Sequence, residues 1–124
     1  MIKIGIIGCG GIANNKHMPA LAKVEAAEMV AFCDIIEERA SKAREAFGTD
    51  AANVYTDYME LLKNDEIDVI HVCTPNISHA EISIAAMESG KHVMCEKPMA
   101  KTSEEAEAMI AAMNRTGKKL TIGY

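Results

Sequence analysis

The sequence predicts an α/β fold with a doubly wound parallel sheet. Short apolar runs, typical of strands that are buried on both faces, alternate along the chain with amphipathic segments at helical spacing. The first apolar run leads directly into a glycine-rich turn and then into a helical pattern. The 124 residues are enough for one domain, residues 1–124, and right-handed crossovers predict the strand order 3-2-1-4-5-6.

Strands are predicted where apolar residues follow one another with few interruptions. They cover residues 2–7, 28–34, 53–55, 68–73, 92–95 and 119–123. Helical spacing predicts the intervening helices over residues 11–24, 37–47, 57–63, 77–89 and 103–115. Pro19 interrupts the first helix, because a proline inside a helix forces a kink or a restart. Gly48, Gly90 and Gly117 end later helices, and Thr102 with Glu105 forms a capping-box pattern.

The same spacing predicts which helical side chains face the core. In chain order these are Ile36, Ala40, Ala43, Phe47, Ile77, Ala80, Ile84, Met87, Ala106, Met109, Ile110 and Met113. Each of these apolar faces is expected to pack against the sheet.

The turn after the first strand has the G-x-G-x-x-A spacing of a phosphate-binding loop. Gly8 permits the tight turn, Gly10 lets the backbone approach a pyrophosphate, and Ala13 is small enough for the helix to pack on its strand. The start of the helix directs unpaired N–H groups at the phosphates. We therefore expect a dinucleotide to contact Gly8, Gly10, Gly11, Ile12 and Ala13. The alternative is a glycine-rich turn that holds no ligand.

Asp34 ends the second predicted strand, 26 residues after Gly8. At that position a carboxylate can accept hydrogen bonds from an adenosine ribose diol, and it would repel a 2′-phosphate. The neighbouring Ile35 and Ile36 offer no cation for such a phosphate. The sequence therefore predicts NAD as the cofactor, with NADP less favoured. The alternative role for Asp34 is N-cap of the second helix, and the two roles can coexist.

The composition argues against several classes of partner. A net charge of −5 argues against nucleic acid and anionic membranes, and no apolar run reaches the roughly 18 residues needed to span a bilayer. Cys9, Cys33, Cys73 and Cys95 are far apart and form no C-x-x-C pair, which indicates a reducing compartment and predicts no metal site. We expect a cytoplasmic protein.

Three further motifs lie near predicted strand ends: Thr74-Pro75-Asn76-x-x-His79, Ser89-Gly90-Lys91-His92-Val93 and Glu96-Lys97-Pro98. Together with the phosphate loop, these motifs resemble the glucose–fructose oxidoreductase, inositol dehydrogenase and rhizopine-catabolism (Gfo/Idh/MocA) family in order and spacing. The resemblance extends over essentially the whole chain. It implies a Rossmann fold and the cofactor-binding domain of an NAD(P)-dependent oxidoreductase that acts on a sugar, cyclitol or related polyol.

The resemblance also implies roles for individual residues. Glu96 and Lys97 match a triplet that lies beside the nicotinamide ribose and the substrate. Lys97 matches the lysine that orients the substrate hydroxyl, so it is the expected catalytic residue. Thr74, Pro75 and Asn76 match a turn along the phosphate–ribose face of the cofactor. The alternative for Lys97 is a solvated loop lysine.

Family members are several hundred residues long, and their second half carries the substrate pocket and much of the oligomer interface. The last predicted strand here resembles the family's sixth strand, so we expect a cofactor domain without the substrate domain and inactive alone. A small polyol or sugar substrate and a homo-oligomer are expected for the full-length enzyme. The alternative is a stand-alone NAD-binding or regulatory module. Whichever alternative holds, we expect His17, His71 and His79 of this chain to be exposed or hydrogen-bonded within the core.

Overall fold

The computed structural model describes residues 1–11, 13–74, 78–96 and 100–123. Within them lie six strands: β1 (Ile2–Ile7), β2 (Ala27–Cys33), β3 (Gly48–Tyr55), β4 (Val69–Val72), β5 (His92–Glu96) and β6 (Leu120–Gly123). The helices are α1 (Met18–Ala22), α2 (Glu37–Phe47), α3 (Tyr58–Leu62), α4 (His79–Glu88) and α5 (Ser103–Thr116). A π-helical turn, η1 (Ala13–His17), precedes α1. None of these helices is long and apolar enough to cross a membrane.

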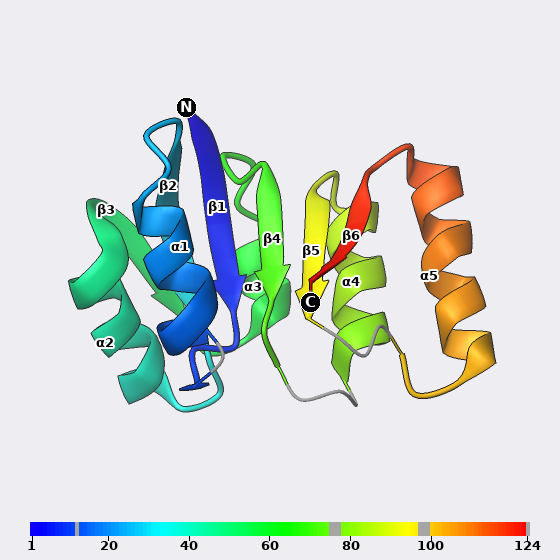
Figure 1. The fold of residues 1–124 in the computed structure, drawn as a ribbon, viewed down its shortest axis with the longest axis horizontal. Coiled ribbons are helices and arrows are strands. Elements are labelled where there is room, and N and C mark those ends of the chain that lie inside the picture. The colour runs from blue at the N-terminus through cyan, green and yellow to red at the C-terminus, as the bar shows by residue number, and fades with distance from the viewer. Residues whose placement is uncertain (12, 75–77, 97–99, 124) are drawn as a thin grey trace.

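The strands form one parallel sheet in the order β3-β2-β1-β4-β5-β6, which confirms the predicted topology. In Figure 1 the arrowheads of the strands point to the lower edge of the molecule. From β1 the chain adds strands in one direction, to β2 and β3. From β4 it adds strands in the opposite direction, to β5 and β6, so the strand order reverses between β1 and β4. Ligands of doubly wound sheets bind at this carboxyl edge, beside the point where the strand order reverses.

Helices cover both faces of the sheet and enclose two apolar cores. On one face, α1 and α2 lie over β1–β3 (Figure 1), and Met18 and Phe32 are fully buried between them and the strands. On the other face, α3, α4 and α5 contribute Leu61, Met87 and Met109 to the second core. Strands that are buried on both faces explain the near-continuous apolar runs in the sequence.

The interruption predicted at Pro19 is confirmed, but its form differs from a simple kink. The chain makes the wider turn η1, and α1 then begins at Met18 with Pro19 in its first turn. A proline has no N–H to donate to the preceding turn, and the first turn of a helix is where that donor is not required.

Three details of the predicted elements are wrong. Ile36 is 44% exposed, because α2 begins after it and Ile36 is the extended N-cap residue. Ile110 is 45% exposed, and Ala112 is buried against the core instead. β3 begins at Gly48 rather than at residue 53, and its pairing with β2 is irregular at that end.

The capping prediction for α5 is confirmed with an offset. Oγ1 of Thr102 accepts the N–H of Glu105 at 3.1 Å. The Glu105 carboxylate reaches back to the N–H of Lys101 at 2.9 Å, one residue before the cap. At the other end, Gly117 adopts a left-handed φ of 72° and ends the helix as predicted.

Candidate functional site

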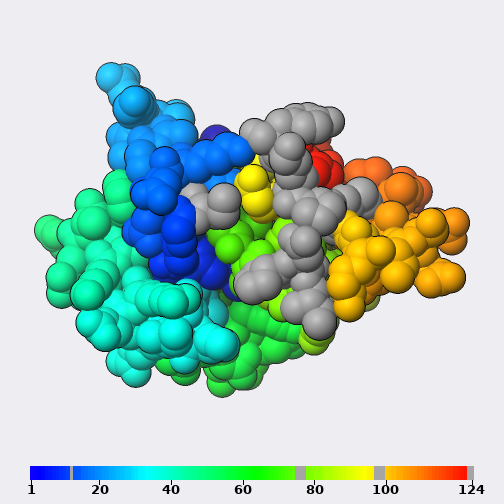
Figure 2. All heavy atoms as spheres, turned by 60° about the horizontal axis from the view of Figure 1, so that its bottom comes forward, coloured from blue at the N-terminus to red at the C-terminus, as the bar shows by residue number. Residues whose placement is uncertain are grey.

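A cleft of about 960 Å³ runs along the carboxyl edge of the sheet, across the ends of β1, β2, β4 and β5. Figure 2 looks onto this side of the molecule, where blue, cyan, green and yellow segments from distant parts of the chain come together. Six of the predicted cofactor-binding residues line the cleft: Gly8, Gly10, Gly11, Asp34, Thr74 and Glu96. The fold therefore brings together residues that the sequence places at four separate strand ends.

Gly8 forms the turn that leaves β1. Its φ is +93°, a conformation that residues with a side chain rarely adopt. A Cβ at this position would lie 2.8 Å from the carbonyl carbon of Cys73 and 2.8 Å from the backbone nitrogen of Thr74. The turn after β1 and the end of β4 are thus in direct contact, and the contact requires a glycine.

The next part of the loop is open toward the cleft. Within the described residues, a Cβ at Gly10 would meet only Nη1 of Arg39, at 4.0 Å. Asn14, which the sequence analysis missed, donates from Nδ2 to the carbonyl oxygens of Cys9 and Gly10 at 2.8 and 2.9 Å. These bonds fix the shape of the loop and leave space beside Gly10. An asparagine at the start of a helix was the available signal, because it commonly bonds to nearby backbone.

Ala13 is fully buried in the core under η1 and α1, where its small side chain lets the helix approach the sheet. It is not among the described residues that line the cleft. Its packing role therefore agrees with the prediction, whereas its contact with a cofactor stays a prediction. Ile12 lies outside the described residues.

Asp34 is 8% exposed and lines the cleft, and two backbone N–H groups hold its carboxylate in place. Oδ2 accepts the N–H of Cys9 at 2.9 Å, and Oδ1 accepts the N–H of Ile36 at 2.9 Å. The first bond ties β2 to the phosphate loop, and the second ties it to the start of α2. The N-cap position itself belongs to Ile36, so Asp34 supports the helix from two residues upstream.

Arg39 places a cation in the cleft that the sequence analysis did not consider. It lines the same cleft as Asp34 and extends toward Gly10. The absence of a cation at Ile35 and Ile36 therefore does not describe the whole surroundings of Asp34, because Arg39 lies one helical turn further on, in α2.

Thr74 carries a polar atom without a partner. Its Oγ1 is buried in the cleft lining and has no hydrogen-bond partner among the described residues. Such a group is costly in the folded state unless something bonds to it, so a polar ligand atom fits this position.

His79 supports the backbone at Thr74, just after β4. The Nε2–H of His79 donates to the carbonyl oxygen of Thr74 at 2.6 Å, and the side chain is 1% exposed. It is a histidine satisfied in the core, which agrees with the prediction. Pro75 and Asn76, the rest of the predicted cofactor turn, lie outside the described residues.

Glu96 ends β5, and both oxygens of its carboxylate are engaged. Oε2 lies 2.6 Å from Nε2 of His17, and Oε1 lies 3.4 Å from Nζ of Lys16. Nδ1 of His17 lies in turn 3.0 Å from Nδ1 of His71 in β4. The sequence analysis treated the two histidines separately and missed this chain, which has no local signal because its members lie on three elements. Lys97, the predicted catalytic residue, lies outside the described residues.

The surroundings of this chain determine its charge. Burial, assisted by the nearby His17, lowers the pKa of His71 to about 4, so the ring is neutral at pH 7. Burial acts to raise the pKa of Glu96, but hydrogen bonds and charges from His17 and Lys16 outweigh it and leave that pKa below its usual value. Glu96 is therefore an ionised carboxylate inside the protein.

The cysteines near the cleft are not activated thiols. Burial, with the charge of Asp34 as the second cause, raises the pKa values of Cys9 and Cys33 to about 12. Burial likewise raises the pKa of Cys95 to about 11. A thiol with such a pKa is protonated at neutral pH and is a poor nucleophile. In the part of the chain that the structure describes, no group of three His, Cys, Asp or Glu residues could hold a metal ion.

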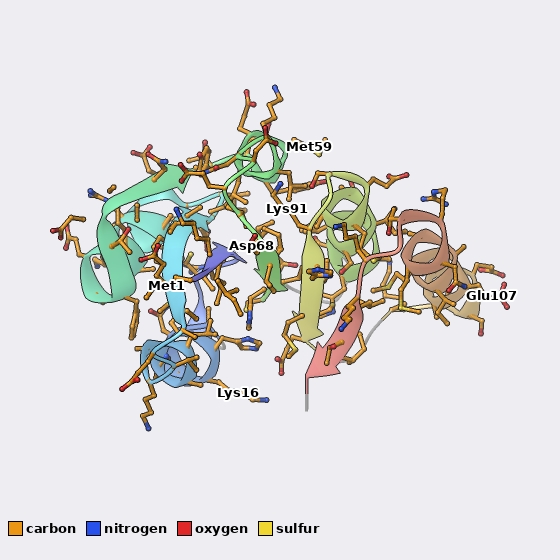
Figure 3. All side chains as sticks on the ribbon, turned by 90° about the horizontal axis from the view of Figure 1, so that it is seen from above. Met1, Lys16, Met59, Asp68, Lys91 and Glu107 are labelled. Atoms are coloured by element: carbon orange, nitrogen blue, oxygen red, sulfur yellow. The ribbon has the colours of Figure 1, made fainter. Side chains whose placement is uncertain are left out.

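The buried lysine Lys91 lies away from the cleft. Figure 3 looks down on the opposite, amino edge of the sheet and labels Lys91 and Asp68, the residues just before β5 and β4. Lys91 is 2% exposed, and burial lowers its pKa against the opposing charges of Asp65 and Asp68. It therefore belongs to the support of the sheet and not to the site.

The lining fits an elongated ligand with a phosphate at its centre. Gly10 leaves space for a group that approaches the backbone closely, and Arg39 supplies positive charge beside it. On one side Asp34 offers carboxylate oxygens, and on the other Thr74 offers an unpartnered hydroxyl. These are the features that a dinucleotide needs from a doubly wound sheet.

Comparison with known proteins agrees with this geometry. Residues 2–124 match the family described as an oxidoreductase family with an NAD-binding Rossmann fold. Inositol 2-dehydrogenase from Salmonella typhimurium is 35% identical over 125 residues, which are 99% of this chain and 37% of that enzyme. D-glucoside 3-dehydrogenase from Escherichia coli is 36% identical over 123 residues, which are 99% of this chain and 34% of that enzyme.

Solved structures show the same fold. KijD10, a 3-ketoreductase from Actinomadura kijaniata in complex with NADP and TDP-benzene, has a TM-score of 0.91 and 32% identity, covering 98% of this chain and 37% of that one. The WlbA dehydrogenase from Chromobacterium violaceum, in complex with NADH and UDP-GlcNAcA, has a TM-score of 0.91 and 34% identity. The match covers 98% of this chain and 34% of that one.

The chain thus spans about a third of the length of these relatives. The family match covers nearly every residue, and the strand order and the glycine loop are those expected of a dinucleotide-binding sheet. This chain therefore belongs to the Gfo/Idh/MocA oxidoreductase family and constitutes its NAD(P)-binding Rossmann domain.

Proposed function

We propose that this chain serves as the cofactor domain of an enzyme that transfers hydride between a nicotinamide cofactor and a sugar, cyclitol or related polyol. The observation that carries the proposal is that the phosphate loop, Asp34 and Glu96 line one cleft at the carboxyl edge of the sheet. The bound cofactor would supply the hydride acceptor or donor at its nicotinamide ring. The residues of the cleft bind and orient it.

The chemistry of the lining suggests how a dinucleotide would lie. The carboxylate of Asp34 is placed to accept hydrogen bonds from the adenosine ribose, and the backbone at Gly10 and Gly11 is placed to approach the pyrophosphate. The nicotinamide half would then extend across the end of β4, past the Thr74 hydroxyl, toward Glu96 at the end of β5.

We further propose that NAD is preferred over NADP. Asp34 is fixed by two backbone N–H groups, so it cannot easily turn away from a 2′-phosphate. Arg39 extends toward Gly10, where the pyrophosphate common to both cofactors is expected. The related structures in complex with NADP and with NADH show that the family accommodates either cofactor.

For the chemical step, we propose Lys97 as the residue that orients the substrate hydroxyl, on the basis of the Glu96-Lys97-Pro98 motif. Glu96 precedes it directly and is anchored to the helix that follows the phosphate loop. Relatives named inositol 2-dehydrogenase and D-glucoside 3-dehydrogenase support a cyclitol or sugar as the substrate class.

Calorimetric titration with NADH and NADPH tests the binding proposal. NADH should bind more tightly, and Asp34→Ser should narrow the preference by about 1–3 kcal/mol, the scale of a hydrogen bond to a charged group. Asp50→Ser is the matched control and should leave the preference unchanged, because Asp50 is an exposed aspartate of β3 that does not line the cleft. Equal or tighter NADPH binding by the unmodified chain would refute the NAD preference. Absence of binding to either cofactor would refute the cofactor role.

A further inference from the structure

A buried chain of side chains joins the phosphate loop to the far end of the cleft. His17 is the last residue of η1, which directly follows the loop, and its ring contacts the carboxylate of Glu96 on one side. On the other side the ring contacts His71. The three residues are 7–9% exposed, so the contacts are largely shielded from water.

The proton arrangement of this chain is constrained. An ionised Glu96 accepts, so the proton on Nε2 of His17 must point at it. The facing Nδ1 atoms of His17 and His71 then share one proton, which resides on His71 when His17 is neutral and on His17 when it is charged. In both arrangements His17 donates to Glu96, and His71 fixes the orientation of the His17 ring.

We propose that His17 is a positioning residue for the nicotinamide half of the bound cofactor, and that it acts by holding the Glu96 carboxylate in the cleft. The inference rests on the proposed cofactor role. Its basis is geometric, because Asp34 directly follows β2 and Glu96 ends β5, two strands on opposite sides of β1, and both residues line the cleft together with the phosphate loop. With the adenosine ribose at Asp34, Glu96 is at the other half of the dinucleotide.

This role makes a prediction that simple packing does not. If His17 only secured α1 to the sheet, its loss would disturb the phosphate loop and weaken every ligand that binds there. If it positions Glu96, its loss weakens ligands in proportion to their contact with the nicotinamide end. ADP carries the adenosine and both phosphates but lacks the second ribose and the nicotinamide ring, so it separates the two roles.

The test compares NADH and ADP by calorimetry on the 124-residue chain. His17→Leu should weaken NADH by about tenfold, the scale of one hydrogen bond to a charged group, and ADP by less than about threefold. His17→Gln, whose amide can reach the position of Nε2, should restore most of the NADH affinity. His92→Gln is the matched control, because His92 lies at the opposite end of β5 and contacts Lys119. It should change neither affinity.

A double-mutant cycle keeps the test decisive. Glu96→Gln should reproduce the selective loss of NADH, and His17→Leu combined with Glu96→Gln should be no worse than either change alone. Should His17→Leu fail to fold, imidazole ¹⁵N spectra of the unmodified chain replace it, with NADH expected to shift the His17 resonances more than ADP does. Equal weakening of both ligands, equal shifts with both, or additive losses in the cycle would overturn the inference. If the unmodified chain binds neither ligand, the cofactor role itself fails.

Discussion

Two glycines of the phosphate loop, two residues apart, should respond in opposite ways to the same substitution. Gly8→Ala would place a Cβ in a left-handed conformation at φ +93° and 2.8 Å from two backbone atoms at the end of β4. Those atoms cannot rotate away as a side chain can. Gly10 has no left-handed φ, and its nearest neighbour among the described residues is the flexible Arg39 end at 4.0 Å. Gly10→Ala should therefore be accepted by the folded chain.

The surroundings of the two glycines determine how strongly each substitution should change the free energy of unfolding and the cofactor affinity. The left-handed conformation costs an alanine about 1–2 kcal/mol, and overpacking against fixed backbone adds about 1–3 kcal/mol. We expect Gly8→Ala to lower the free energy of unfolding by about 2–5 kcal/mol, a large share of the 5–15 kcal/mol that is typical of a domain. Gly10→Ala should change it by less than about 0.5 kcal/mol. It should instead weaken NADH and NADPH alike, by about tenfold or more, because the added methyl group occupies space that the pyrophosphate needs.

The assay is urea unfolding followed by far-ultraviolet circular dichroism, since the chain contains no tryptophan. Cofactor affinity is measured by calorimetry on the same samples. The reasoning is refuted if Gly8→Ala unfolds at the urea concentration of the unmodified chain. It is equally refuted if Gly10→Ala binds NADH with undiminished affinity, because the loop would then lie outside the binding site.

Three further predictions concern pH, charge and turnover. Because the folded-state pKa of His71 is about 4 and its ordinary value is 6.5, its contribution to stability is present above pH 6.5 and is lost as the pH falls toward 4. Between pH 7 and 5 this amounts to about 2 kcal/mol, and urea titrations of His71→Gln should show a correspondingly smaller loss. Arg39→Ala should weaken NADH and NADPH equally, by about 1–3 kcal/mol; a loss confined to NADPH would place this cation at the 2′-phosphate instead. The 124 residues alone should form no NADH from NAD and any cyclitol or sugar, since positioning the substrate contributes about 7–11 kcal/mol to lowering the barrier; measurable turnover would contradict this.

The sheet and its order could be predicted because their signals are local. Each strand is an apolar run between turn residues, and the right-handed crossover rule then orders the strands. The two wrongly predicted core residues, Ile36 and Ile110, are positions to which the apolar spacing of a helix was extended too far. Ile36 continues the apolar spacing of α2 but precedes its first turn, and Ile110 lies about 100° around the helix from the buried Met109.

The site was predictable only in part, for a different reason. Gly8 and Asp34 belong to a motif whose spacing is written in the sequence. The contact between His17 and Glu96 joins residues 79 positions apart, and the contact between His17 and His71 joins residues 54 apart. No local pattern can report such pairs, because they arise only when parallel strands bring their carboxyl ends to one edge. The placement of Arg39 beside Gly10 likewise depends on how α2 packs on the sheet.

These long-range contacts have a common centre in residues 8–17, the phosphate loop and η1. The end of β4 touches this segment at Gly8, and the end of β2 is bonded to it through Asp34 and Cys9. The end of β5 is bonded to it through Glu96 and His17. Three of the strands that border the cleft are therefore held by the segment that would meet the phosphates. Because these bonds form within the protein itself, the cleft is organised before any ligand arrives, and less ordering is left to oppose binding. A substitution at the loop glycines Gly8 or Gly10 should consequently alter both ends of the cleft at once, whereas a substitution at His17, Asp34 or Glu96 should alter only one end.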